Sequence, residues 1–184
     1  LIGGTAYYYI VLAVDSANGV EDANRAERSG VPTGPITTQT LTDTFEGSES
    51  GGGFDLPGWT NNPINGSTLW VHSAAQKYDG AYSWFAQDIG SVSDMVLASP
   101  SFGVLSSPPT TLSFYHTYAF EGSTSSCYDG GTLEYTTDGG TTWAVVPAVD
   151  FTAGAYTGTV NAGFSNPIGG KAAWCGGTVG AMAQ

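Results

Sequence analysis

Positive charge is scarce in this chain of 184 residues. Only 11% of the residues are charged, and 4 Lys and Arg residues stand against 16 Asp and Glu residues, which gives a net charge of −12. Proteins that bind nucleic acid need clustered Lys and Arg side chains to neutralise phosphates. The composition therefore predicts that nucleic acid is not a partner.

Long hydrophobic runs and helical periodicity are missing as well. The longest apolar stretch, Ala6–Val14, is shorter than the about 20 residues that span a bilayer, and it is rich in tyrosine. No window repeats apolar residues at i, i+3, i+4 and i+7 over three turns, as an amphipathic helix requires. We expect neither membrane insertion nor a helical domain.

Glycine, proline and aromatic residues are abundant instead. The 27 Gly, 9 Pro and 12% aromatic residues indicate short strands joined by tight turns. Strand-like runs recur between turn signals at 37–45, 67–73, 81–88, 94–102, 110–120, 131–137, 141–147, 155–160 and 171–175. The sequence predicts an all-β fold, an antiparallel β-sandwich of the jelly-roll kind.

Cysteine is limited to Cys127 and Cys175, each in a glycine-rich loop. An even count in a chain of this composition favours a disulfide and an oxidising compartment. Such a bond would stabilise the fold by about 4 kcal/mol through loop closure. Two buried free thiols are the alternative interpretation.

Residues 1–34 differ in character from the rest of the chain. They hold an aromatic strand-like run, a polar turn, a second weak run and a Pro/Gly linker. The first run resembles the penultimate strand of a fibronectin type III domain, with matching residues Thr5, Tyr7, Val11, Ala13, Val14 and Asp15. Tyr7 falls at the place of the tyrosine corner. We expect this region to be the C-terminal part of such a domain, with its other strands upstream.

Residues 35–184 contain an ordered series of motifs at 43–46, 79–84, 96–102, 112–121, 128–143 and 169–177, with Trp59 after the first. The series resembles the MAM-like or cleaved-adhesin-like jelly-roll modules of secreted bacterial proteins, including immune-inhibitor-A-type metallopeptidases. The resemblance implies a jelly roll for this region. The closing strands of those modules are absent from the sequence, so we expect the module to be truncated at its C-terminal end.

The same resemblance implies a structural calcium ion. Its ligands would be acidic residues in the matching loops, namely Asp43, Glu46, Asp79, Glu121 and Asp129. Carboxylates at strand ends and in glycine-rich loops can converge on a cation that needs 6–8 oxygen ligands. The alternative interpretation is that these residues are ordinary turn and surface carboxylates.

The segment Thr136–Trp143 matches the Asp-box of sialidase-type propellers, apart from Thr in place of the first Ser. A propeller needs several copies of this motif, and the sequence has one. We therefore interpret the segment as a tight hairpin. Asp138 is expected to cap the turn, with Gly139 and Gly140 at unusual dihedral angles and Trp143 packed beneath.

Aromatic rings offer a possible surface for stacking on sugars. The candidates are Trp59, Trp70, Tyr82 and Trp84, which lie near loops or share one face of a strand-like run. Large aromatic side chains more often belong to the core, which is the alternative interpretation.

Catalytic sequence motifs are missing. The sequence has no H-E-x-x-H, G-x-S-x-G or P-loop pattern, and His72 and His116 lie on separate strand-like runs. We expect no catalytic residues in this chain. A pair of glycosidase carboxylates stays open, because its spacing is set in space and not in sequence.

The expected function is that of a non-catalytic module in a larger secreted or cell-surface bacterial protein. The module would bind a protein or glycan on a surface or substrate, in adhesion, in substrate targeting or as an accessory domain of a secreted peptidase. Two alternatives remain. One is a structural subunit that joins other copies into an extracellular filament by strand exchange. The other is a carbohydrate-binding module.

Overall fold

The computed structural model describes residues 6–10, 12, 14, 16–21, 23, 25–31, 40–104, 109–123 and 125–184. The chain forms two compact units: Leu1–Leu41 with Ser101–Val104, and Thr42–Pro100 with Leu105–Gln184. Strands, bridges and turns dominate both units, and the described residues contain a single short 3-10 helix, η1 (Ala148–Asp150). The predicted all-β class is confirmed.

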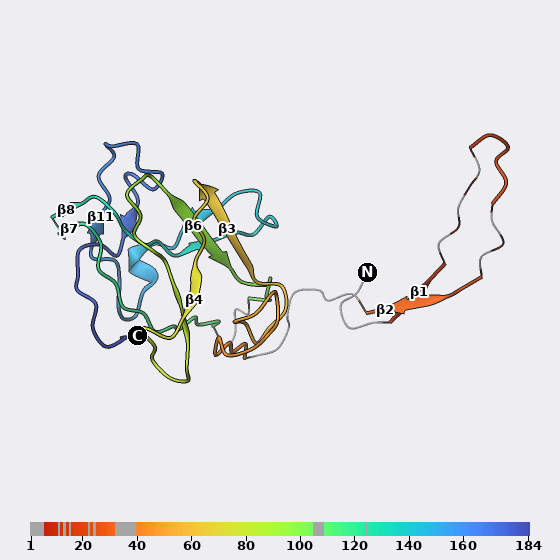
Figure 1. Ribbon diagram of the computed structural model, residues 1–184, viewed down its shortest axis with the longest axis horizontal. Helices are drawn as coiled ribbons and strands as arrows, with labels where there is room; N and C mark the ends of the chain where they lie inside the picture. The colour runs from red at the N-terminus through yellow and green to blue at the C-terminus, as the bar shows by residue number, and fades with distance from the viewer. Residues whose placement is uncertain are drawn as a thin grey trace. The chain divides into compact units, whose positions relative to one another are not determined.

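The first unit is built around a hairpin of two short strands (Figure 1). Strand β1 (Tyr7–Tyr9) pairs antiparallel with β2 (Arg28–Gly30). The polar turn between them is closed by the Asn18 side chain, whose oxygen accepts a hydrogen bond from the Val20 N–H at 2.8 Å. Four residues of the fibronectin pattern, Thr5, Val11, Ala13 and Asp15, lie outside the described residues, as do linker residues 32–35. The fibronectin resemblance stays a prediction.

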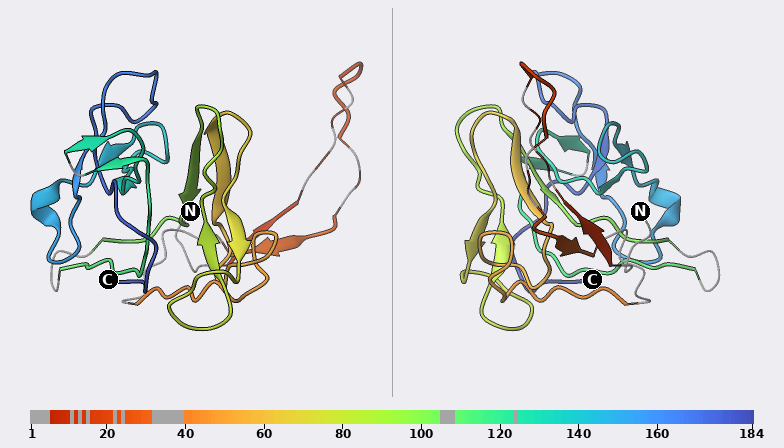
Figure 2. Two further views of the ribbon diagram at one scale, coloured as in Figure 1. Left: turned by 60° about the vertical axis from the view of Figure 1, so that its left-hand side comes forward. Right: turned by 90° about the vertical axis from the view of Figure 1, so that its right-hand side faces the viewer.

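The second unit begins with residues 42–100, which we call its N-terminal half. Figure 2 shows the two antiparallel ladders of this half. Strand β3 (Thr60–Asn65) pairs with β6 (Asp94–Ala98), and β4 (Val71–Ser73) pairs with β5 (Ser83–Phe85). Three of the strand-like runs predicted from the sequence, 67–73, 81–88 and 94–102, contain β4, β5 and β6.

Strand β3 was not predicted, because its sequence TNNPIN is rich in residues that disfavour strands. Pro63 has no N–H to donate, so it is tolerated only at an edge or an irregularity. The structure provides both conditions. Among the described residues β3 pairs on one side only, and its register with β6 shifts between Pro63 and Asn65.

Residues 109–184 form what we call the C-terminal half of the second unit. Its ladders are short antiparallel pairs: β7 (Gly122–Ser123) with β8 (Ser126–Cys127), β9 (Glu134–Tyr135) with β10 (Ala144–Val145), and β11 (Gly158–Thr159) with β12 (Ala172–Ala173). Single bridges connect Cys127 to Val160 and Gly131 to Trp174. Every sheet in the described residues has two strands, so the jelly-roll strand order stays a prediction.

The second unit has a different core in each half. In the N-terminal half, five aromatic side chains form what we call the Phe54 cluster: Phe45, Phe54, Trp59, His72 and Trp84. In the C-terminal half, small side chains surround a disulfide in what we call the disulfide core: Cys127, Val160, Ala173 and Cys175, with Ile168 against them.

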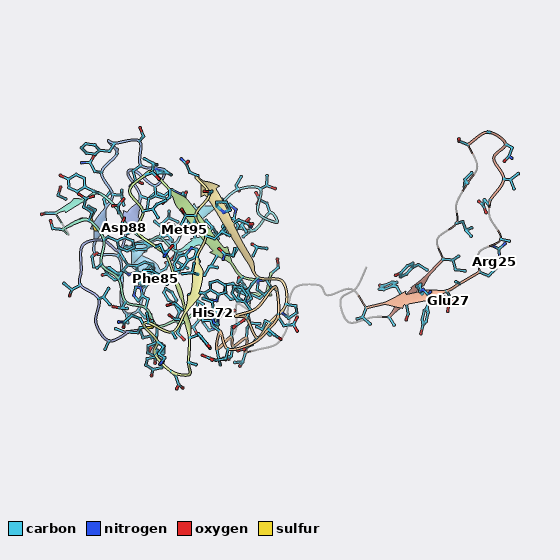
Figure 3. All side chains as sticks on the ribbon, in the orientation of Figure 1. Arg25, Glu27, His72, Phe85, Asp88 and Met95 are labelled. Atoms are coloured by element: carbon cyan, nitrogen blue, oxygen red, sulfur yellow. A yellow bond between two sulfur atoms is a disulfide. The ribbon has the colours of Figure 1, made fainter. Side chains whose placement is uncertain are left out.

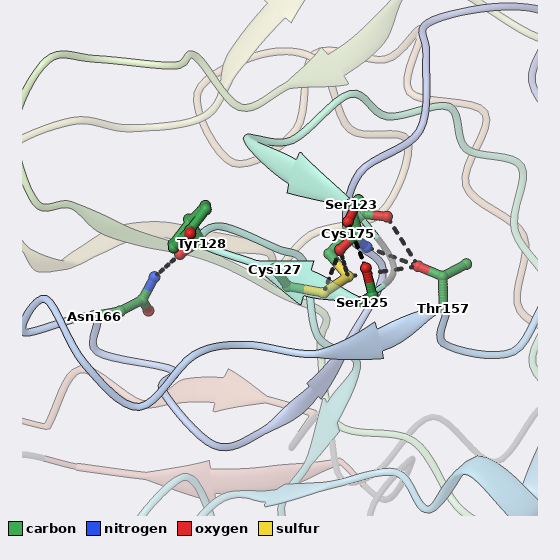
Figure 4. Close-up of a disulfide and its surroundings, with 7 residues drawn as sticks. All are labelled: Ser123, Ser125, Cys127, Tyr128, Thr157, Asn166 and Cys175. Carbon is green, nitrogen blue, oxygen red and sulfur yellow. Dashed lines mark hydrogen bonds between the residues drawn. A yellow bond between two sulfur atoms is a disulfide. The ribbon is translucent and has the colours of Figure 1, made fainter.

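The disulfide between Cys127 and Cys175 is confirmed, with 5.6 Å between the two Cα atoms. Figure 4 shows how the backbone is fixed beside it. The Thr157 hydroxyl donates to the Cys175 carbonyl at 3.0 Å and accepts from the Cys175 N–H at 2.9 Å. All four core side chains are at most 1% exposed, so the disulfide lies in a dry interior.

The predicted strand at 110–120 has an alternating pattern but no extended ladder. Its inward side chains form what we call the aromatic row: Phe114, His116, Tyr118 and Phe120, with neighbouring ring centroids 5.3–5.8 Å apart. His116 makes the one described bridge of this run, to Ala183. The run therefore has the alternation of a strand, and its described bridge is to Ala183 near the end of the sequence.

Candidate functional site

A cavity of about 340 Å³ lies beside the aromatic row. Its walls include aromatic rings and neutral polar groups from His116, Tyr118, Thr157, Trp174, Thr178 and Gln184. This volume is at the lower end of the range for small-molecule sites. The cavity is our candidate binding site.

The cavity forms because the last residues of the chain run antiparallel to the aromatic row. His116 and Ala183 exchange two backbone hydrogen bonds, at 2.9 and 3.0 Å. The Gly180 N–H donates to the Thr117 hydroxyl at 3.0 Å. Gly177 has a φ of +78°, and a Cβ at this position would lie 2.9 Å from the Tyr118 ring. Only glycine permits this approach without displacement.

Trp174 is the buried part of the cavity wall. Its side chain is 6% exposed, and its indole N–H donates to the Gly154 carbonyl at 2.7 Å. Four rings contact it edge-on, from Phe114, His116, Phe151 and Tyr156. Edge-to-face contacts of this kind are favourable for aromatic pairs. The indole is therefore held in one orientation before any ligand arrives.

His116 contributes a neutral ring to the cavity. Burial lowers the pKa of its imidazole, because a partly dehydrated site disfavours the charged form. None of the described residues that line the cavity is an Asp, Glu, Lys or Arg. The described side chains of the wall therefore offer apolar surface and neutral hydrogen-bonding groups.

The structure uses two of the predicted calcium ligands as backbone acceptors. The Asp43 carboxylate accepts hydrogen bonds from the N–H groups of Phe45, Asp55 and Leu56, at 2.9–3.2 Å. The Glu46 carboxylate accepts from the N–H groups of the two residues after Gly80, both at 2.8 Å. Asp43 and Glu46 thus hold loops in place through hydrogen bonds.

The other predicted ligands divide between the two halves. Asp79 lies in the loop that Glu46 holds, and its carboxylate accepts from the Gly80 N–H at 2.8 Å. Asp129 lies in the C-terminal half. Partial burial raises the pKa of its carboxyl, and the charges of Glu121 and Asp88 raise it further.

In the described part of the chain, no three His, Cys, Asp or Glu side chains converge as metal ligands would. Glu121 and Asp129 interact with each other, while Asp43, Glu46 and Asp79 belong to the other half. A single calcium site with all five ligands stays a prediction.

The four predicted stacking residues do not share one surface. Trp59 and Trp84 are half-buried and stack on Phe54, at centroid distances of 5.0 and 4.6 Å. The Trp70 indole N–H donates to the Met95 carbonyl at 3.0 Å. Tyr82 is 43% exposed and stacks on His72, which is labelled in Figure 3. Tyr82 is thus the one ring of the four that is largely open to solvent.

The hairpin interpretation of the Asp-box segment is confirmed. The Asp138 carboxylate accepts from the Thr142 hydroxyl at 2.6 Å, from the Thr142 N–H at 2.9 Å and from the Thr136 hydroxyl at 2.8 Å. These bonds lower the pKa of Asp138 to about 2. Gly139 and Gly140 have φ values of 73° and 91°, and the Trp143 indole N–H donates to the Gly140 carbonyl at 3.2 Å.

Sequence reasoning missed the cavity and the part that Trp174 plays in it. The alternation of Phe114, His116, Tyr118 and Phe120 did signal a shared face. Nothing in the sequence indicated that residues 177–184 would lie against that face, because their glycine-rich pattern predicts no strand.

Comparisons of the chain with protein-family models, with curated proteins and with solved structures find no match. The described residues contain no helix of the length and hydrophobicity needed to cross a membrane. The two family resemblances therefore rest on the sequence motifs alone.

Proposed function

We propose that this chain is a non-catalytic binding module of a larger secreted or cell-surface protein, with a role in adhesion or substrate targeting. The observation that carries the proposal is the half-open cavity beside the aromatic row, because its Trp174 wall is held by four ring contacts and its described lining includes no Asp, Glu, Lys or Arg. Sites with these properties are typical of small-molecule recognition.

A neutral sugar unit of a glycan is the ligand class that best fits the cavity. The rings of His116, Tyr118 and Trp174 provide apolar surface for the C–H groups of a sugar. The side chains of Thr178 and Gln184 provide donors and acceptors for its hydroxyl groups. The absence of charge among the described lining residues disfavours phosphorylated and acidic ligands.

The disulfide supports an extracellular location for the module. A bond between Cys127 and Cys175 forms and persists in oxidising compartments, and it is rare in the reducing cytosol. A stapled β fold also tolerates exposure to proteases better than an unstapled one, because local opening is restrained.

The positions of the histidines support a non-catalytic role. His72 Nε2 lies 2.7 Å from the Phe45 carbonyl in the Phe54 cluster, whereas His116 lies in the cavity. Burial is the one cause that shifts the pKa of His116, and no carboxylate contributes to that shift. A general base normally has a group that orients it, such as the carboxylate of a catalytic triad.

Binding measurements on cavity variants test the proposal. We expect a neutral glycan from a broad panel to bind the wild-type chain, and Thr178→Val and Gln184→Ala to weaken that binding at least fivefold with unchanged melting. Gln87→Ala is the matched control, because Gln87 is exposed and lies outside the cavity lining. Failure of every neutral glycan in the panel to bind would refute the proposed ligand class.

We also propose that calcium stabilises the module through Glu121 and Asp129. The support is that burial and, after it, the nearby charge of Glu121 raise the pKa of Asp129, and a bound cation would relieve the repulsion between the two carboxylates. Calcium should raise the melting temperature relative to excess chelator, and Asp129→Asn should remove the difference. Asp43→Asn is the comparison variant. Asp43 accepts three backbone N–H groups, so this substitution should lower stability equally with and without calcium. An unchanged melting temperature would contradict the proposal that calcium stabilises the module.

Open strand edges favour self-association as a second candidate function. Within the described residues, β3 pairs only with β6, so its other edge has no ladder partner. Ile64 on β3 is 66% exposed, which adds apolar surface to one such edge. Edges of this kind can pair with another chain. Size-exclusion chromatography should then show oligomers that increase with concentration, and a concentration-independent monomer would contradict this function.

A further inference from the structure

Two exposed tyrosines from distant parts of the second unit lie face to face. The rings of Tyr78 and Tyr115 are 3.5 Å apart between centroids, and their planes differ by 7°. The two residues are 58% and 41% exposed. Tyr78 belongs to the loop between β4 and β5, and Tyr115 belongs to the run that carries the aromatic row. The pair therefore joins the N-terminal half to the C-terminal half.

The rings are arranged head to head. A hydrogen bond between the two hydroxyls is the main cause that raises the pKa of Tyr78, because the neutral Tyr78 hydroxyl is the donor. When two parallel rings overlap with their hydroxyls adjacent, the ortho carbons beside each C–OH also face each other. The contact therefore brings together the ring positions at which phenoxyl radicals couple.

The backbone holds both tyrosines near each other. His116, next to Tyr115, is fixed by its two backbone bonds to Ala183. The loop that carries Tyr78 is held by Glu46, which accepts from the N–H groups of Ala81 and Tyr82. Full overlap of two rings is electrostatically less favourable than an offset or edge-on contact. We therefore attribute the overlap to these anchors and to the hydroxyl contact.

We propose that Tyr78 and Tyr115 form an oxidative cross-linking site, at which a haem peroxidase with hydrogen peroxide joins the two rings through their ortho carbons. The proposal is independent of the ligand in the cavity. The cross-link would join the two halves of the second unit covalently, whereas the disulfide lies within the C-terminal half.

The chemistry balances with hydrogen peroxide as the oxidant. Each phenol loses one electron and one proton to the peroxidase, which gives two phenoxyl radicals with spin density on the ortho carbons. These carbons form one C–C bond, each then loses its hydrogen as a proton, and each ring oxygen regains a proton. The two phenols lose two hydrogen atoms in total, and hydrogen peroxide is reduced to two water molecules.

Proximity makes this pair more reactive than Tyr82 and Tyr128, two other exposed tyrosines of the second unit. Tyr82 stacks on His72, and Tyr128 contacts the Phe164 ring edge-on, so neither ring faces another phenol. Radicals on those residues must meet a radical on another molecule. Coupling between Tyr78 and Tyr115 is intramolecular, and well-oriented intramolecular reactions have a large rate advantage.

The experiment treats the purified chain with a haem peroxidase and hydrogen peroxide at low protein concentration. We expect blue dityrosine fluorescence, a monomer lighter by two hydrogen atoms, and a cross-linked peptide pair that contains Tyr78 and Tyr115. The yield should not depend on protein concentration. The cross-linked monomer should melt roughly 10 °C higher than the untreated one, because the link restricts the unfolded chain.

Phenylalanine variants identify the site without loss of the ring contact. Tyr78→Phe and Tyr115→Phe should each reduce the monomeric product at least tenfold, whereas the matched control Tyr82→Phe should retain it. Two results would overturn the proposal. One is a cross-link that maps to other tyrosines in the wild-type monomer, and the other is dityrosine that forms only between molecules.

Discussion

The two halves of the second unit build their interiors in different ways. The N-terminal half packs large rings against one another around Phe54, which is 2% exposed. The C-terminal half places small side chains around a disulfide and relies on ladders two residues long. Rings bury much apolar surface each, so stacking alone can hold a small cluster. Trp174 and its ring contacts lie beside the disulfide core, in the same half. The disulfide core itself holds only cysteine, valine and alanine and buries less apolar surface, so we infer that it depends on its covalent bond.

Loss of the disulfide should have the largest effect. The double variant Cys127→Ala, Cys175→Ala should lower the free energy of unfolding by about 4 kcal/mol, because a long loop is no longer closed in the unfolded chain. Urea titration with and without reductant measures this. Reductant should destabilise the wild type and leave the double variant unchanged. Equal stability of the oxidised and reduced wild type would contradict the dependence of the C-terminal half on its disulfide.

Removal of the central ring tests the other half. Phe54→Ala should destabilise by about 3 kcal/mol through the cavity it leaves between Trp59 and Trp84. Near-ultraviolet circular dichroism should lose signal from these stacked rings. Val149→Ala is a control, because Val149 is 89% exposed and its truncation should change stability little. If both variants behave alike, the Phe54 cluster is not a core.

A pH effect should identify the partly buried imidazole of the cavity wall. Burial lowers the pKa of His116 in the folded state, so the unfolded state binds a proton first as pH falls. Stability should therefore decrease as pH falls below about 6.5, the unfolded pKa, and through the folded pKa. His116→Gln should flatten the unfolding free energy between pH 7 and 5, whereas the exposed variant Gln87→Ala should retain the slope. A slope that survives in His116→Gln would contradict this assignment.

The smallest effect is expected at the exposed hairpin between β9 and β10. The folded pKa of Asp138 is about 2, below its value in the unfolded chain, so its stabilising contribution is present above about pH 4 and is lost as pH falls toward 2. Carboxyl chemical shifts followed by NMR should titrate with a midpoint near 2. Asp138→Asn should remove that titration and leave both cores intact. A midpoint near 4 would mean that the threonine bonds do not form.

The all-β class was predictable from the sequence because its causes are local. Glycine-rich turns, strand-like runs and the absence of helical periodicity each act over a few residues. The hairpin around Asp138 was predictable for the same reason. Strand β3 was not, since its asparagines and Pro63 disfavour strands and its pairing depends on β6. Tertiary contacts override local preference there.

The candidate site was less predictable, because it depends on contacts between distant segments. The pairing of Cys127 with Cys175 was predicted from the count of two. The position of the final residues beside His116 was not, and without it the cavity has no second wall. The acidic residues illustrate the same limit. Asp43 and Glu46 accept backbone N–H groups that no local pattern specifies, and their predicted part in a calcium site stays a prediction.

The most direct test of the proposed binding function is an NMR titration of the isotope-labelled chain with a panel of neutral glycans. The cavity predicts that the Trp174 indole N–H and the Gly180 and Ala183 amides shift together on binding, while Tyr82 and the Trp84 indole stay in place. Shifts centred on Tyr82, or none with any glycan, would contradict the claim that the cavity beside the aromatic row is the binding site.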